Sequence, residues 1–94
     1  MIKKLTHMPY AQAHVCVHEN GDIELISYAT SVCTITADGW LTCTGTYSMT
    51  TAHHISAFMR EYGNGFDYYS AKECYIRNRA LNIYTAEIIE YPRG

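Results

Sequence analysis

The stretch that decides the fold is YSMTTAHHISAFMREYGNG, residues 47–65, where a threonine-rich pattern of period two gives way to one of period 3.6. Ser48, Thr50 and Thr51 carry hydroxyl groups that can accept hydrogen bonds from the free N–H groups of a first helical turn. The apolar residues that follow share one helical stripe: Ala52, Ile55, Phe58, Met59 and Tyr62. The glycines of residues 63–65 end the pattern. The stretch therefore predicts a junction between a strand and an amphipathic helix.

Upstream of this junction, two similar turns at residues 18–22 and 36–40 separate stretches of alternating polarity. Two-residue loops would set apolar side chains opposite polar ones across each hairpin. Three-residue loops, with Gly21 and Gly39 in the left-handed conformation, avoid this mixing, and we favour them. The resulting cross-strand pairs are Val17 with Ile23, Val15 with Leu25, Ile35 with Leu41 and Cys33 with Cys43.

This register sorts the strands into two faces. The predicted inner face is Ala13, Val15, Val17, Ile23, Leu25, Cys33, Ile35, Leu41, Cys43 and Tyr47. The predicted outer face is His14, Cys16, His18, Glu24, Ile26, Tyr28, Thr34, Thr36, Trp40, Thr42, Thr44 and Thr46. Residues 27–32 contain no Gly, Pro, Asn or Asp, which favours one long, bent central strand over residues 23–36. An ordinary four-stranded meander is the alternative.

After the first helix, Ser70 and Glu73 have the spacing of a capping box and predict a second helix that ends near Arg79. Residues 81–84 resume alternation and predict a short strand, residues 85–86 a turn, and residues 87–91 a further strand or a helical turn. The predicted fold class is α+β. It comprises an antiparallel sheet of hairpins with a long bent central strand, packed by one amphipathic helix and followed by a second helix and a short C-terminal strand.

Composition narrows the class of protein. A chain of 94 residues with 48% hydrophobic and 17% charged residues is too apolar for intrinsic disorder, and we expect one domain over residues 1–94. The net charge of −2 disfavours non-specific nucleic-acid binding. We find neither a signal-peptide pattern nor a membrane-spanning run, so we expect a cytoplasmic protein. The four cysteines lack C-x-x-C spacing and are expected to be reduced thiols.

Two clusters of polar residues suggest ligand sites. His14, Cys16 and His18 share one strand face, but residues two apart in a strand seldom close on one metal ion, so we expect no metal and no cofactor. At the start of the first helix, an anion site would combine Ser48, Thr50, Thr51, His53 and Arg60 with the free N–H groups of the helix. The alternative is that the hydroxyls only cap the helix.

Catalysis is the weakest of the hypotheses. Cys43 or Ser48 could act as a nucleophile with His53 or His54 as a base. No carboxylate has a spacing that would orient either imidazole, and Cys43 points inward in the favoured register. We therefore expect a protein that is not an enzyme.

The predicted outer face carries the most unusual surface. Tyr28, Trp40, Thr42 and Thr44 lie on it, and the chain has nine tyrosines, more amphipathic rings than a monomer of this size requires. Threonines and aromatic residues are also simply good strand formers. The functional interpretation is that Trp40 anchors a protein contact or a sheet-to-sheet homodimer.

The sequence also resembles a small uncharacterised domain found in bacteriophages and mobile elements of gut bacteria. The similarity covers roughly residues 25–90 and centres on a G-x-Y-S-x-T-T-x-x-H-I-x-x-F core, Gly45 to Phe58 in this chain. The resemblance implies a phage protein made in the host cytoplasm. Small phage proteins of this kind are often inhibitors of host defence, including anti-CRISPR proteins and sponges for signalling nucleotides.

Three hypotheses follow. The first is a binding protein that masks a host partner protein, such as a CRISPR or other anti-phage defence component, with a homodimer as the alternative contact of the same surface. The second is a sponge that holds a nucleotide or another phosphorylated small molecule at the first helix. The third is a small Cys/Ser–His hydrolase.

Overall fold

The structure, a computed structural model, describes residues 1–44 and 48–90 of the chain. Its elements in order are β1 (Ile2–Lys4), β2 (Ala13–Val17), β3 (Ile23–Ser27), β4 (Thr30–Ile35), β5 (Trp40–Cys43), α1 (Met49–Tyr62), α2 (Tyr68–Ile76), β6 (Arg79–Asn82) and β7 (Ile88–Glu90). All seven strands join one antiparallel sheet in chain order, and both helices are inserted between β5 and β6. The predicted α+β class is confirmed.

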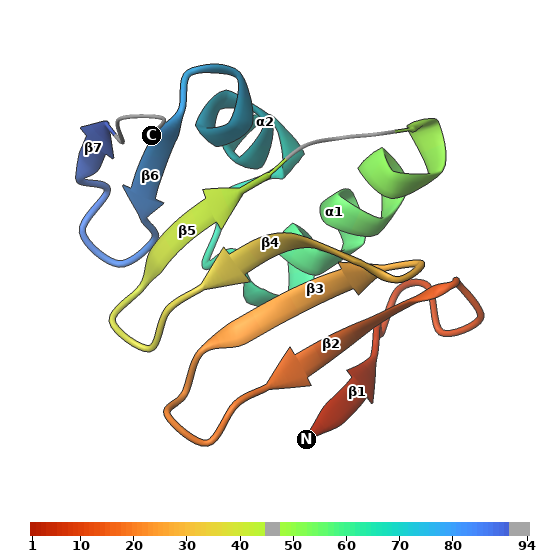
Figure 1. The fold of residues 1–94 in the computed structure, drawn as a ribbon. Coiled ribbons are helices and arrows are strands. Elements are labelled where there is room, and N and C mark those ends of the chain that lie inside the picture. The colour runs from red at the N-terminus through yellow and green to blue at the C-terminus, as the bar shows by residue number, and fades with distance from the viewer. Residues whose placement is uncertain (45–47, 91–94) are drawn as a thin grey trace.

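Both helices lie on the same side of the sheet (Figure 1). Helix α1 turns Ile55, Phe58 and Met59 toward the strands, and each of these side chains is almost fully buried. They meet the inner residues of the hairpins, such as Leu25 and Leu41, in one hydrophobic core. The amphipathic stripe therefore packs on the sheet as the sequence predicts.

The hairpin registers are confirmed. Val17 pairs with Ile23 and Cys33 with Cys43, which is the pairing that three-residue loops require. Gly39 shows why glycine is needed, because its φ is +99° and a Cβ atom there would lie 2.5 Å from the Tyr84 ring. The two faces separate accordingly, with Leu41 and Ile35 buried and Trp40 only partly buried. Thr46 and Tyr47 lie outside the described residues.

The long central strand is wrong, and the alternative meander is correct. Tyr28 and Ala29 form a two-residue turn between β3 and β4, which pair with each other from Ile23↔Ile35 to Ser27↔Thr30. Tyr28 has a φ of 59°, a conformation that is uncommon for a residue other than glycine. Because the turn uses none of the usual turn residues, the sequence carries no signal for it.

A β-bulge in β4 changes the predicted alternation. Leu25 pairs with Cys33, but Ile26 pairs with Ser31, so Val32 has no opposite residue. Val32 is fully buried, and Ser31 turns to the outer side beside Ile26. A single extra residue therefore moves a serine out of the core and a valine into it.

The capping box that was predicted for the second helix is also wrong. Asp67 is the N-cap of α2 and accepts a hydrogen bond from the Ser70 N–H at 3.2 Å, while Glu73 pairs with Arg77. The helix ends at Ile76, before the predicted end, because the chain enters β6 at Arg79.

The C-terminal strands follow the predicted order. The strand predicted at residues 81–84 is β6, displaced two residues toward the N-terminus. The expected turn begins earlier than predicted and covers residues 83–85, closed by a hydrogen bond from Ala86 N–H to the Asn82 carbonyl at 2.8 Å. The strand alternative for residues 87–91 is correct over Ile88–Glu90, and Tyr91 lies outside the described residues.

Candidate functional site

The outer face of the sheet has no cover from residues 1–44 and 48–90. The helices lie on the inner side, and so does the loop after β1, where Leu5 enters the core and Thr6 donates from its backbone N–H to Glu61 of α1 at 3.0 Å. No element within residues 1–44 and 48–90 crosses the outer side of the strands (Figure 1). The second layer that would bury this face is therefore not supplied by the described part of the chain.

Small and β-branched side chains form a row across the outer face. Successive strand pairings place five residues side by side: Ile2, Cys16, Glu24, Thr34 and Thr42. Residues 1–12 show no clear period, so Ile2, which is 70% exposed at the edge of this row, could not be predicted. Methyl groups and hydroxyls dominate the row, with one carboxylate in its middle.

That carboxylate, Glu24, is satisfied within the face. Its side chain accepts a hydrogen bond from Ser31 Oγ at 2.5 Å, and His18 Nε2 lies 3.0 Å from it. The hydrogen bond from Ser31 lowers the pKa of Glu24, and the hydrogen bond to His18 adds to the effect. Glu24 therefore carries its charge with partners already in place.

The four predicted interface residues do not stay together. Trp40 and Thr42 share the outer face of β5, where Trp40 pairs with Asn82 of β6. Thr44 follows the end of β5 and donates from its hydroxyl to the Ser31 carbonyl at 3.0 Å. Tyr28 was placed on the outer face, but its ring lies 5.7 Å from the ring of His54 on α1. Its place in the β3–β4 turn, and not in a strand, is the reason.

The five predicted anion-site residues divide into two groups. Ser48 caps α1 by accepting from the Thr51 N–H at 3.1 Å, and its hydroxyl also donates to the Thr51 hydroxyl. Thr51 is buried, whereas Thr50 is exposed. The helix-capping interpretation accounts for Ser48 and Thr51.

His53 and Arg60 lie elsewhere, along the flank of α1. They line a shallow cavity of about 240 Å³ together with His7 and Met8 from the loop after β1. His7 was not part of the predicted site, because no sequence pattern connects the loop to the helix. The cavity brings two imidazoles and one guanidinium to a common opening.

A buried polar pair links the sheet to α1. Ser27 Oγ at the end of β3 lies 2.8 Å from His54 Nδ1, and the Thr51 hydroxyl lies 3.3 Å from Ser27 Oγ. Burial lowers the pKa of His54, and the neighbouring His53 adds to this shift. The sequence contained one signal for this contact. Ser27 falls at an inner position of the strand alternation, where its hydroxyl needs a hydrogen-bond partner.

The structure pairs His54 with a residue other than the two nucleophiles of the hydrolase hypothesis, Cys43 and Ser48. His54 takes Ser27 as its partner, and Cys43 points into the core. Ser27 and His54 are only 2% and 1% exposed, so the pair is closed to a substrate in this structure. Its evident role is to satisfy polar groups between the sheet and α1.

The cysteines are all free thiols, three of them buried. Cys33 has a raised pKa because of its hydrogen bond with Cys43 and its burial, and burial raises the pKa of Cys74 to about 11. Cys16 is partly exposed on the outer face near His14. In the described ranges, no three His, Cys, Asp or Glu side chains come close enough to hold a metal ion.

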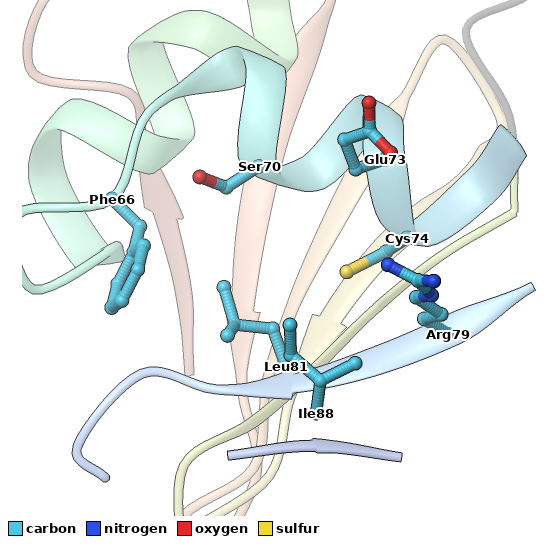
Figure 2. Close-up of a pocket in the computed structure, with 7 residues that line it drawn as sticks. All are labelled: Phe66, Ser70, Glu73, Cys74, Arg79, Leu81 and Ile88. Carbon is cyan, nitrogen blue, oxygen red and sulfur yellow. The ribbon is translucent and has the colours of Figure 1, made fainter. Parts of the chain in front are cut away.

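A more enclosed cavity of about 280 Å³ lies between α2, β6 and β7. Figure 2 shows Phe66, Leu81 and Ile88 around it, with Cys74 and the Arg79 guanidinium at one end. The sequence did not predict this cavity, because its walls come from three elements whose packing no local pattern specifies.

Comparison with known proteins gives one match. Residues 2–77 match a Family of unknown function (DUF8033). No curated protein and no solved structure gives a match to the chain. In the part of the chain that the structure describes, neither helix combines the length and apolar character needed to cross a bilayer.

Proposed function

We propose that this chain, which belongs to the DUF8033 family of unknown function, is a binding protein that masks a surface of a partner protein with the outer face of its sheet. The observation that carries the proposal is the contrast between the two sides of one sheet. Both helices cover the inner side, and no described element covers the outer side. A sheet face that no described element covers is a natural surface for a second protein layer.

The chemistry of the face supports burial against a partner. Threonine and isoleucine lose little side-chain freedom on binding, and Glu24 already has hydrogen-bond partners at His18 and Ser31. Trp40 supplies an indole of the kind that is enriched in interface centres. With principal extents of 34 × 28 × 26 Å, the molecule is wide enough for the roughly 800 Å² per partner of a standard interface.

The partner we propose is a host protein of the anti-phage defence systems, such as a CRISPR component, bound in the host cytoplasm. The support is the resemblance of the Gly45 to Phe58 core to domains of bacteriophages and mobile elements of gut bacteria. Masking requires no catalytic group, which suits a protein whose Ser27–His54 pair is buried. The same outer face would serve a homodimer when no host partner is present.

The test is a pull-down from lysates of gut bacteria with the tagged chain, read by native mass spectrometry. Trp40→Ala should weaken partner capture by about 30-fold or more, since an interface anchor contributes about 2 kcal/mol. Tyr69→Ala is the matched control, because Tyr69 is 69% exposed on α2, on the other side of the molecule. Capture that Trp40→Ala and Tyr69→Ala reduce equally would contradict the proposal.

A second variant tests the centre of the face and the homodimer together. Thr34→Lys places a charge between Glu24 and Thr42, and we expect it to abolish partner capture and to shift any dimer to monomer. Tyr69→Lys introduces the same charge on α2 and should change neither. A partner complex or a dimer that survives Thr34→Lys would place the interface elsewhere.

The second candidate function is a sponge for a phosphorylated small molecule. The cavity that joins His7, His53 and Arg60 supports it, because these side chains can all donate hydrogen bonds to phosphate oxygens. A nucleotide at 100 times its dissociation constant would stabilise the fold by about 2.7 kcal/mol. A thermal-shift panel of nucleotides should show stabilisation that Arg60→Gln and His53→Gln remove and that Arg77→Gln, at the C-cap of α2, preserves. Stabilisation that persists in both cavity variants would reject this site.

A further inference from the structure

The cavity between α2, β6 and β7 combines an apolar body with one charged end. Phe66, Leu81 and Ile88 form apolar walls, and Leu81 and Ile88 face the cavity as a cross-strand pair of β6 and β7. The guanidinium of Arg79 lies next to the Cys74 thiol at the opposite end from Phe66 (Figure 2). At about 280 Å³, the cavity is at the lower limit of sizes that hold small molecules.

Arg79, one of the residues that line this cavity, has an unused hydrogen-bond donor. Its Nε atom is buried and has no hydrogen-bond partner among the described residues. A buried donor that loses water without gaining a partner costs about 1–3 kcal/mol, and more when the group is charged. The Arg79 side chain as a whole keeps 32% of its surface exposed, so the guanidinium stays charged and an acceptor that reaches it would recover this cost.

The nearby acids do not fill this role. Glu73 lines the cavity but is paired with Arg77, whose Nε lies 2.5 Å from its carboxylate. Glu90 lies 3.7 Å from the Nη2 atom of Arg79, beyond hydrogen-bond length, and its side chain is 76% exposed. Glu90 can therefore turn into water when a stronger anion reaches Arg79.

The other end groups favour an anion that is small and carries an apolar body. Burial raises the pKa of Cys74 to about 11, so its thiol stays neutral beside the guanidinium. The Ser70 hydroxyl, also in the lining, donates to Asp67 Oδ1 at 3.4 Å, a long hydrogen bond that it can exchange for one to an anion in the cavity. The walls would cover a ring or a short alkyl chain and exclude water from it.

We propose that this cavity is a binding site for a small carboxylate with an apolar body, held by a hydrogen-bonded ion pair between the carboxylate and Arg79. The site is independent of the outer face of the sheet and of the cavity beside Arg60. It uses Arg79 as the anion-binding group and Phe66, Leu81 and Ile88 as the apolar contacts.

The test is a titration of the full chain with benzoate, benzamide and benzyl alcohol, followed by two-dimensional ¹H–¹⁵N NMR. Benzoate should give saturable shifts at residues that line the cavity, such as Ser70, Cys74 and Leu81. The two neutral analogues share the ring but not the charge, so they should bind at least about tenfold more weakly. Equal affinity for benzoate and benzamide, no saturation with benzoate, or shifts centred on His53 and Arg60 would overturn the proposal.

Three variants locate the anion contact. Arg79→Gln should weaken benzoate binding about 10- to 100-fold, as expected for the loss of a hydrogen bond to a charged group. Glu90→Gln, on the exposed side, should strengthen it because a competing carboxylate is removed. Arg60→Gln removes the same charge from α1 and should leave affinity within about twofold. Unchanged benzoate affinity in both the Arg79 and the Glu90 variants would overturn the assignment of Arg79 as the anion-binding group. If Arg79→Gln does not fold, the affinity of Glu90→Gln alone decides the assignment.

Discussion

The two faces of the sheet are built from alternate residues of the same strands, yet the inner face is buried and the outer face is partly exposed. Leu25 is fully buried under α1, whereas its neighbour Ile26 lies on the outer face with part of its side chain in water. Both residues belong to the same strand, β3. The difference arises because α1, α2 and the loop after β1 all lie on one side. The alternation along a strand thus determines the face on which each side chain lies. The positions of the helices and of the loop after β1 determine which face is covered.

The largest effect should come from deleting apolar volume on the covered face. Leu25→Ala should lower the free energy of unfolding by about 2–5 kcal/mol, since Leu25 is fully enclosed and a cavity would remain. Ile26→Ala, one residue away on the open face, should cost about 1 kcal/mol. Urea denaturation of the two variants measures both values. Equal losses would mean that the outer face is packed as tightly as the inner one.

The buried pair of Ser27 and His54 should give the covered face a pH dependence. Burial lowers the pKa of His54 below its ordinary value of 6.5, so the folded protein resists a proton that the unfolded chain accepts. Stability is fully present above pH 6.5 and falls as the pH decreases from 6.5 toward the lower pKa of the folded state, by at most about 1.4 kcal/mol per pH unit.

Urea denaturation between about pH 5 and 7 measures this slope. His54→Gln removes the titrating group, so its slope should be shallower than that of the wild type. Ser27→Ala leaves His54 without its partner at 2.8 Å and should cost about 1–2 kcal/mol at pH 7. Identical slopes in the wild type and in His54→Gln would show that the buried imidazole does not contribute.

The smallest change in stability should come from the cysteine on the open face. Cys16→Ser should alter the free energy of unfolding by no more than about 0.5 kcal/mol, as is usual for a surface position. It should also remove the fastest-reacting thiol when the native protein is treated with iodoacetamide. Cys33 and Cys74 are buried and have raised pKa values, so little reactive thiolate forms there. Peptide mass mapping after a short alkylation measures the order in which the cysteines react. Modification of Cys33 or Cys74 before Cys16 would show that the core opens.

Much of the fold could be predicted because its signals are local. Gly21 and Gly39 determine three-residue loops, and the loops together with the alternation determine the register from Val15↔Leu25 to Cys33↔Cys43. The turn at Tyr28 could not be predicted in the same way, because a tyrosine with positive φ leaves no compositional mark. The N-cap at Asp67 was missed because Ser70 and Glu73 imitate a capping box.

The candidate sites depended more heavily on tertiary structure. The proposed anion site divided because helical periodicity sends Thr51 toward the sheet and His53 toward the flank, where His7 joins it across a long sequence separation. The Arg79 cavity had no sequence signal, because α2, β6 and β7 become walls only when they pack together.

By itself, the amino-acid sequence determined the α+β class, the registers of the β2–β3 and β4–β5 hairpins and, outside the bulge in β4, the side of these strands that carries apolar residues. These properties depend on φ preferences and on periodicity, both of which act over a few residues. Only the tertiary structure decided that both helices cover one face, that Ser27 meets His54, and that Arg79 keeps an unpartnered donor. These arrangements depend on how much apolar area is buried between segments that lie far apart in the sequence. No local pattern specifies that area.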